Sequence, residues 1–226
     1  KKPLCLSLEE MEAIEHRYND CVSQSEPRLV MVGYNRRFAP QVQKMKQLLN
    51  AVTSPKAFIM TVNAGPIALD HWTQDPVVGG GRIIGEGCHF IDLLMFLAGE
   101  PITDWRASSM KAVSRDTVTI EMSFGDGSIG SVHYFSNGSK AFPKERLEVF
   151  CEGRVLQMDN FIRMAGYGWP GFRKMNLWRQ DKGQSFCVNS FVKAIENGGE
   201  APINFREIVD GTRISILAQK QDSMDQ

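Results

Sequence analysis

The sequence predicts an α+β fold, with a predominantly antiparallel open sheet and helices on one face. Between residues 55 and 158, short strand-like segments follow one another through tight turns such as Gly125-Asp126-Gly127, and turns this short join antiparallel neighbours. Helical periodicity appears before, within and after this region. The 226 residues are enough for one large domain or a domain with an appendage, and 42% apolar and 23% charged residues are typical of a globular protein.

The first predicted helix and strand form a different kind of unit from the elements that follow. Ser7, with Glu10 three residues later, forms a capping box, and the apolar spacing that follows predicts a helix over about residues 8–22. Residues 28–34 contain an unbroken apolar run at 29–32, which is typical of a strand buried on both faces of a parallel sheet. This helix and strand have the form of the end of an α/β unit.

The remaining elements belong to a second, larger part of the chain. We therefore predict one unit over residues 1–35 and a domain over 36–226, whose last helix packs back on the first unit. The helices are predicted at 39–51, 87–98, 184–197 and about 205–219, and the strands at 56–63, 103–112, 116–124, 128–136, 145–151 and 154–158.

Composition excludes several classes of protein. Lysine plus arginine and aspartate plus glutamate each number 26, so no net charge draws the chain to nucleic acid or to an anionic membrane. No apolar run approaches the roughly 20 residues that span a bilayer. The cysteines form no Cys-x-x-Cys pair or zinc-like cluster, so we predict no metal site and a cytoplasmic location: Cys5, Cys21, Cys88, Cys151 and Cys187.

The stretch most suggestive of chemistry is residues 79–94. Its glycines predict a flexible loop in which backbone approaches something closely, and a helix follows with His89 and Asp92 three residues apart on one side. An imidazole beside a carboxylate can move a proton near neutral pH. The alternative is a core histidine that donates to a nearby carbonyl, with Asp92 capping or pairing locally. The glycines are not a dinucleotide fingerprint, because no convincing strand precedes them.

In these segments the chain resembles the Gfo/Idh/MocA oxidoreductases, the family of glucose-fructose oxidoreductase and inositol dehydrogenase. The order and spacing of the segments together carry the resemblance, which spans nearly the whole chain. They are Lys2-Pro3-Leu4, residues 32–38, the triple glycine 79–81, Gly87-x-His89-x-x-Asp92-Leu93-Leu94, residues 124–128 and residues 145–156.

The resemblance implies a nicotinamide enzyme with two domains. Residues 1–35 would be a remnant of the Rossmann-like dinucleotide-binding domain, and 36–226 the substrate-binding, catalytic and oligomerisation domain. The cofactor would be NAD or NADP, bound mostly by residues outside this sequence, because the sequence lacks the family's Gly-x-Gly-x-x-Gly turn.

The resemblance also assigns roles to single residues. Lys2 and His89 would be catalytic, with His89 taking the hydroxyl proton and Asp92 orienting it. Lys2, Pro3 and Asn35 would lie at the cofactor. A frayed terminal lysine is the alternative for Lys2.

Four further residues are candidates for substrate binding. Glu86 would bind a substrate hydroxyl, and Arg36 and Arg37 suit a carboxylate or phosphate, although paired arginines also occur in surface ion pairs. Trp169, in a loop of aromatics and glycines, would contact a sugar or form a lid; a buried loop or a subunit contact is the alternative.

Two positions depart from the family pattern. Lys1 stands where the family usually has glutamate. Gly85 stands where members often carry an aspartate four residues before the histidine, and Glu86 follows one place later. The usual acid/base carboxylate has therefore moved or is absent.

The leading functional hypothesis is hydride transfer between a nicotinamide and a secondary hydroxyl or ketone of a sugar, nucleotide sugar or cyclitol. Two alternatives stay open: a non-catalytic ligand-binding and oligomerisation module, and an NAD-assisted glycosidase or lyase on the same fold. We expect a small-molecule substrate and a homo-oligomer that associates through the antiparallel sheet.

Overall fold

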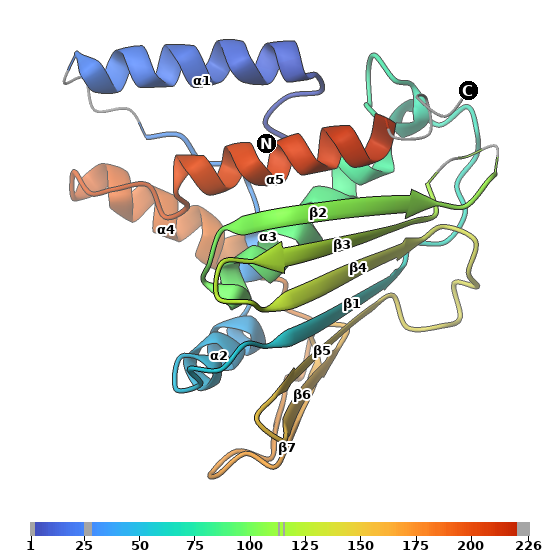
Figure 1. The fold of residues 1–226 in the computed structure, drawn as a ribbon, viewed down its shortest axis with the longest axis vertical. Coiled ribbons are helices and arrows are strands. Elements are labelled where there is room, and N and C mark those ends of the chain that lie inside the picture. The colour runs from blue at the N-terminus through green and yellow to red at the C-terminus, as the bar shows by residue number, and fades with distance from the viewer. Residues whose placement is uncertain (1–2, 25–28, 113, 115, 221–226) are drawn as a thin grey trace.

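One open sheet of eight strands organises the molecule (Figure 1). The computed structural model describes residues 3–24, 29–112, 114 and 116–220. The strand order is β2-β3-β4-β1-β5-β6-β7-β8, and every neighbouring pair is antiparallel except β1 with β4. The strands are β1 (Ala57–Asn63), β2 (Ile102–Ser109), β3 (Val118–Phe124), β4 (Ile129–Phe135), β5 (Glu145–Cys151), β6 (Arg154–Asp159), β7 (Arg163–Tyr167) and β8 (Lys174–Asn176).

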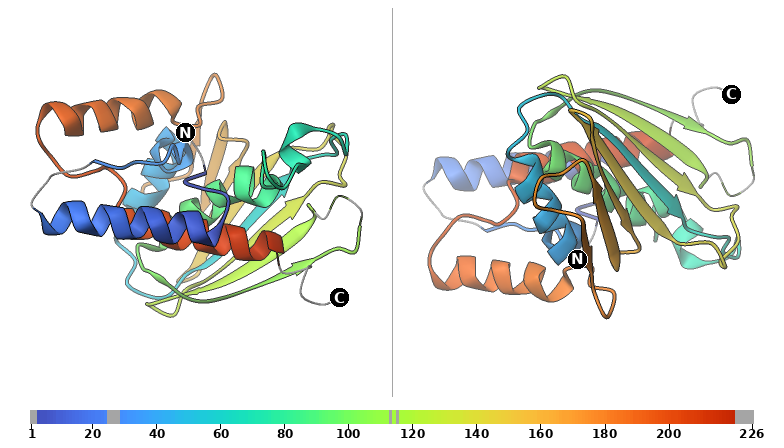
Figure 2. Two further views of the ribbon diagram at one scale, coloured as in Figure 1. Left: turned by 90° about the horizontal axis from the view of Figure 1, so that it is seen from above. Right: turned by 90° about the horizontal axis from the view of Figure 1, so that it is seen from below.

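The helices lie in layers on one side of the sheet. Helix α3 packs against the sheet, α5 packs on α3, and α1 packs on α5 (Figure 2). The helices are α1 (Leu8–Ser23), α2 (Pro40–Leu49), α3 (Cys88–Ala98), α4 (Gln184–Glu196) and α5 (Phe205–Lys220); short helical turns are η1 (Asn35–Phe38), η2 (Trp72–Gln74) and η3 (Ile83–Gly87). Within the described residues, no helix combines the length and apolarity needed to cross a membrane.

The main core lies between the sheet and α3. Along β1, Phe58, Met60 and Val62 are buried and alternate with partly exposed residues, as expected for a strand with one covered face. Helix α3 is apolar on nearly all sides because the sheet and α5 enclose it. The contact is so close at Gly130 that an added Cβ would lie 3.1 Å from Cδ1 of Leu94, which explains a glycine inside β4.

The predicted fold class is confirmed: the sheet is open and mainly antiparallel, with helices on one face. The strand predicted at 28–34 is wrong for the described residues 29–34, which form no strand. Its last amides instead close local turns, from Tyr34 N to Val32 O and from Asn35 N to Gly33 O. An apolar run becomes a strand only when a neighbour supplies backbone hydrogen bonds, and no strand of the described part of the chain lies beside it.

Helix α5 also contacts the N-terminal helix. The rings of Tyr18 and Phe205 stack with centroids 3.8 Å apart, and Arg213 pairs with Glu15 at 3.5 Å. The division of the chain at residue 35 stays a prediction.

Candidate functional site

The glycine-rich loop at 79–81 is shaped by the chain's own packing. A Cβ on Gly79 would lie 2.4 Å from the carbonyl oxygen of Trp72, and one on Gly81 would overlap the Gln219 side chain on α5. Gly81 has φ +92°, and Oε1 of Gln219 accepts the amide of Ile83 at 3.0 Å. The close approach predicted for these glycines is therefore made to η2 and α5, and it anchors the loop that we expected to be flexible.

The loop leads into η3, a single π-helical turn that continues directly into α3. Glu86 lies in this turn and His89 at the start of α3, three residues later. Single π-helical turns recur at functional sites because they redirect side chains without ending the helix.

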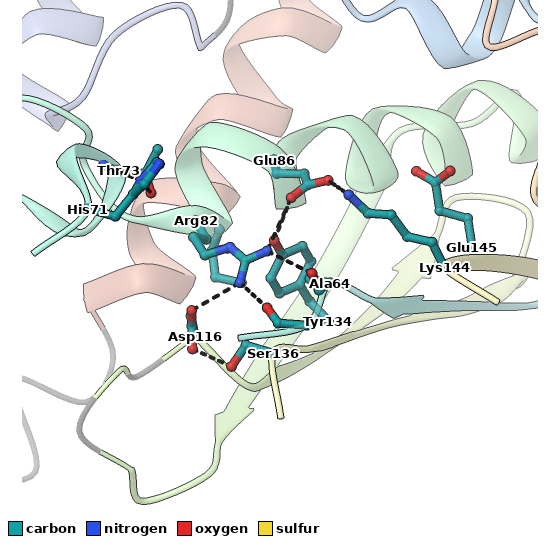
Figure 3. A network of polar contacts seen from close by, with 12 residues as sticks. Ala64, His71, Thr73, Arg82, Glu86, Asp116, Tyr134, Ser136, Lys144 and Glu145 are labelled. Atoms are coloured by element: carbon teal, nitrogen blue, oxygen red, sulfur yellow. Dashed lines mark hydrogen bonds and ion pairs between the residues drawn. The ribbon is translucent and has the colours of Figure 1, made fainter. Parts of the chain in front are cut away.

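Glu86 is held as an anion. Its Oε2 accepts the hydroxyl of Tyr134 at 2.7 Å, its Oε1 accepts from Nζ of Lys144 at 2.8 Å, and Arg82 lies at 3.7 Å (Figure 3). Burial by itself would raise the pKa of Glu86, but the hydrogen bonds from Lys144 and Tyr134 outweigh it and lower the pKa to about 2. At neutral pH Glu86 is thus an acceptor of hydrogen bonds and not a reservoir for protons.

Arg82 lies beside both Glu86 and Tyr134 and is itself anchored by several polar contacts. It donates to the carbonyl oxygens of Gly65 at 2.7 Å and Ala64 at 3.3 Å, and it pairs with buried Asp116 at 3.4 Å. Its guanidinium lies 5.3 Å from the centroid of the Tyr134 ring (Figure 3). Arg82 therefore helps to hold the ring of Tyr134, and the Tyr134 hydroxyl in turn donates to Glu86.

His89 is only 2% exposed. Its ring meets the edge of Tyr34, with centroids 5.8 Å apart and planes at 73°. Tyr34 is itself fully buried and bonds Thr212 of α5 at 3.4 Å. The imidazole is consequently held in a low-dielectric environment.

Asp92 and Arg37 form a buried ion pair. Nη2 and Nε of Arg37 donate to the two Asp92 oxygens at 2.5 and 3.1 Å, and Nη2 also reaches Glu207 at 2.8 Å. Complete burial raises the pKa of Asp92 to about 6, against the opposing effect of Arg37. The structure thus gives Asp92 an arginine partner and places Arg37 in the interior, where we expected a ligand-facing side chain.

Arg36 also forms an ion pair in the protein interior. Its Nη2 donates to Oε1 of buried Glu145 at 2.8 Å, and Lys182 approaches Oε2 of the same carboxylate at 2.5 Å. Nδ2 of Asn35 donates to the carbonyl oxygen of Lys182 at 2.6 Å. These contacts tie η1 to the start of β5 and to the segment before α4.

Three predicted site residues remain, namely Trp169, Pro3 and Lys2. Trp169 is buried in the β7–β8 connection, where its indole N–H donates to the carbonyl oxygen of Val155 at 3.1 Å, so the buried-loop alternative describes its position. Pro3 is partly exposed near the start of the described chain. Lys2 lies outside the described residues.

The structure therefore surrounds Glu86 with residues that sequence reasoning missed, namely Tyr134, Lys144 and Arg82. The alternation of β4 identifies Tyr134 only as a core position. The hydroxyl of Tyr134 could have indicated a polar partner, because a buried tyrosine hydroxyl needs a hydrogen bond. Lys144 carries no comparable signal in sequence.

A mainly antiparallel open sheet backed by helices, with Glu86 and His89 at the head of the central helix, defines an α+β domain. A sequence model described as the GFO/IDH/MocA C-terminal domain matches residues 42–157, about half of the chain. The chain belongs to this family.

Curated relatives share about one residue in five with the chain. Rhizopine catabolism protein MocA of Rhizobium meliloti is 21% identical over 62% of this chain and 52% of its own length. Inositol 2-dehydrogenase 2 of Paenarthrobacter aurescens is 22% identical over 97% of this chain and 67% of its own. The chain thus spans between half and two thirds of the length of these relatives.

Solved structures show the same fold. The oxidoreductase domain protein from Kribbella flavida superposes with a TM-score of 0.81 at 17% identity, covering all of this chain and 71% of that one. UDP-N-acetylglucosamine 3-dehydrogenase from Acidithiobacillus ferrooxidans gives a TM-score of 0.73 at 19% identity, covering 96% of this chain and 68% of that one.

Replacing Arg37 tests whether it acts in folding or in binding. We expect Arg37→Met to lower the free energy of unfolding by about 3–5 kcal/mol, because Asp92 would be left as an uncompensated buried charge. Urea unfolding measures this loss. The exposed Arg106→Met should change stability by less than about 0.5 kcal/mol. An Arg37→Met protein of full stability but weakened ligand binding would restore the substrate-binding role.

The titration of Glu86 tests its electrostatic environment. Side-chain carboxyl NMR should give a pKa near 2, so the stability that ionised Glu86 contributes is lost as pH falls from its ordinary value of 4.5 toward 2. Tyr134→Phe removes one charge-assisted hydrogen bond and should raise this pKa by about one unit. Tyr167→Phe, at an exposed position, should leave it unchanged. A wild-type value at or above 4.5 contradicts the assignment.

Proposed function

We propose that this chain is the substrate-binding and catalytic half of an NAD(P)-dependent oxidoreductase. The reaction is hydride transfer between the nicotinamide and a secondary hydroxyl or ketone of a sugar, nucleotide sugar or cyclitol. The observation that carries the proposal is a buried histidine, His89, at the start of α3, three residues after a carboxylate, Glu86, whose pKa is lowered to about 2. Membership of the GFO/IDH/MocA family supports the reaction class.

In this proposal His89 takes the proton of the reacting hydroxyl. Its buried position excludes water from the imidazole. Glu86 also accepts a second substrate hydroxyl and so orients the sugar ring. Asp92 acts indirectly. Its ion pair with Arg37 holds α3, the helix that carries His89, in position.

The hydride acceptor would be NAD or NADP. The sequence holds no Gly-x-Gly-x-x-Gly turn after a strand, and Asn35, predicted to lie near the cofactor, already donates to Lys182. The described residues therefore do not form a dinucleotide site by themselves. We propose that Lys2 and Pro3 meet the cofactor at the edge of a site supplied mainly by other residues.

The names of two relatives support the substrate class. One is an inositol 2-dehydrogenase and another a UDP-N-acetylglucosamine 3-dehydrogenase, and both names specify a ring carbon as the position of oxidation. We propose the same class of ring hydroxyl here. All five cysteines are free and buried, which supports a reducing compartment, and we propose the cytoplasm.

Substitution of His89 tests the catalytic proposal. We expect His89→Asn in the full-length gene product to lower kcat about 10²–10⁴-fold with a small change in KM, because a general base is lost and binding is kept. Formation of reduced nicotinamide from myo-inositol or UDP-N-acetylglucosamine provides the assay. His16→Asn, on the exposed side of α1, is the matched control. Full activity in His89→Asn would remove His89 from the mechanism.

We also propose that the open face of the sheet joins two copies of the chain. Register places Ile129, Ala57, Phe150, Val155 and Tyr167 in one row across five strands, and the first, third and last are 59%, 41% and 56% exposed. No helix of the described chain covers this face (Figure 2). An apolar row of this length is typical of an interface.

Charge placed on this row should separate the copies. We expect the double variant Ile129→Lys, Phe150→Lys to be monomeric where the wild type is dimeric or larger, because two lysines cannot be buried without partners. Light scattering after size exclusion measures the mass. Val22→Lys, an exposed apolar position on α1, should not change it. A monomeric wild type would refute the interface.

A further inference from the structure

Lys144 differs from the other cations around Glu86 in its exposure. Its side chain is 44% exposed, against 8% for Arg82 and 17% for Lys182. The described contacts assign the buried guanidinium of Arg82 to two carbonyls and Asp116, and Lys182 to Glu145. Lys144 is thus the cation of this cluster that solvent, and therefore a ligand, can reach.

The ammonium of Lys144 has donors to spare. An ammonium offers three N–H groups, and the contact with Glu86 at 2.8 Å uses one of them. Glu86 in turn is shared among Lys144, Tyr134 and Arg82, so its charge only partly offsets that of the lysine. Figure 3 shows the Lys144 side chain extended toward Glu86 from the start of β5.

The backbone at Lys144 is held in place. Its carbonyl oxygen accepts the amide of Asn63 at 2.7 Å, and the next amide, of Glu145, donates to Oδ1 of Asn160 at 2.9 Å. With the backbone fixed at one end and Glu86 at the other, the side chain loses little further freedom when it binds a ligand.

Open space lies on the same turn. A Cβ added to Gly85 would meet no atom within 4 Å, and Gly85 directly precedes Glu86 in η3. A larger residue would fit at position 85, but glycine adds neither bulk nor charge there.

We infer that Lys144 binds an anionic oxygen of the substrate, a carboxylate or a phosphate, beside the hydroxyl that meets His89. The substrate is then an acidic or phosphorylated sugar or cyclitol. Glu86 positions the lysine and also supplies the acceptor for a neighbouring hydroxyl. This inference rests on the proposed function and narrows its substrate class.

Matched ligand pairs test the inference on this chain. Titrations followed by backbone amide NMR compare D-glucuronate with D-glucose for a carboxylate, and myo-inositol 1-phosphate with myo-inositol for a phosphate. We expect the anionic member of at least one pair to bind about tenfold more tightly, as one charge-assisted hydrogen bond provides, and added salt to reduce the difference. The pair that shows the difference identifies the anion.

Substitutions locate the effect. Lys144→Met should abolish the preference for the anion and Lys144→Arg should retain most of it. Gly85→Asp should weaken it independently, because it adds a negative charge one residue before Glu86, at a position with room for a side chain. Lys140→Met, an exposed lysine in the same connection before β5, should change nothing. The melting temperature of each variant verifies that it is folded.

The outcomes separate the inference from the function on which it rests. Equal binding within both pairs, or a preference that persists in Lys144→Met and Gly85→Asp, overturns the anion site and leaves the proposed function standing. Failure of the wild-type chain to bind any of the four ligands also overturns the anion site, whereas the proposed function is overturned by the absence of nicotinamide reduction with both myo-inositol and UDP-N-acetylglucosamine.

Discussion

Two adjacent arginines in η1 connect the layers of this domain. Arg36 pairs with Glu145 at the start of the sheet strand β5, and Arg37 pairs with Asp92 inside α3 and with Glu207 on α5. Removing an ion from water is costly, and each guanidinium is stable in the interior only while its carboxylate is in place. The pairs thereby require one mutual placement of η1, the sheet and the helices, and the position of α3 follows from it.

That placement creates two different carboxylates on one helix. Asp92 is completely buried, and its charge is used to hold Arg37. Glu86, at the head of the same helix, receives hydrogen bonds from Tyr134 and Lys144 and remains partly accessible. The carboxylate available to a ligand is therefore the one in the π-helical turn, one place after the position where the family often has aspartate.

Local pattern predicted most of the elements but not all of them. Strand-like segments joined by tight turns identified β1 and β4, and the strongly apolar segment at 87–98 identified α3, within a few residues. Strands β7 and β8 were missed because glycines and polar residues interrupt any alternation there. The apolar run at 29–32 looked like a strand for the opposite reason, since composition alone does not provide a hydrogen-bonded neighbour.

The sequence by itself determined the fold class and the family, and it singled out Glu86, His89 and Asp92 as candidate site residues. Only the tertiary structure decided that Arg36 and Arg37 face the interior, that Trp169 is buried, and that Tyr134 and Lys144 meet Glu86. Periodicity reports which side of an element is apolar. The partner of a charged group comes from segments far away in the chain, and burial of the pair is decided when those segments pack.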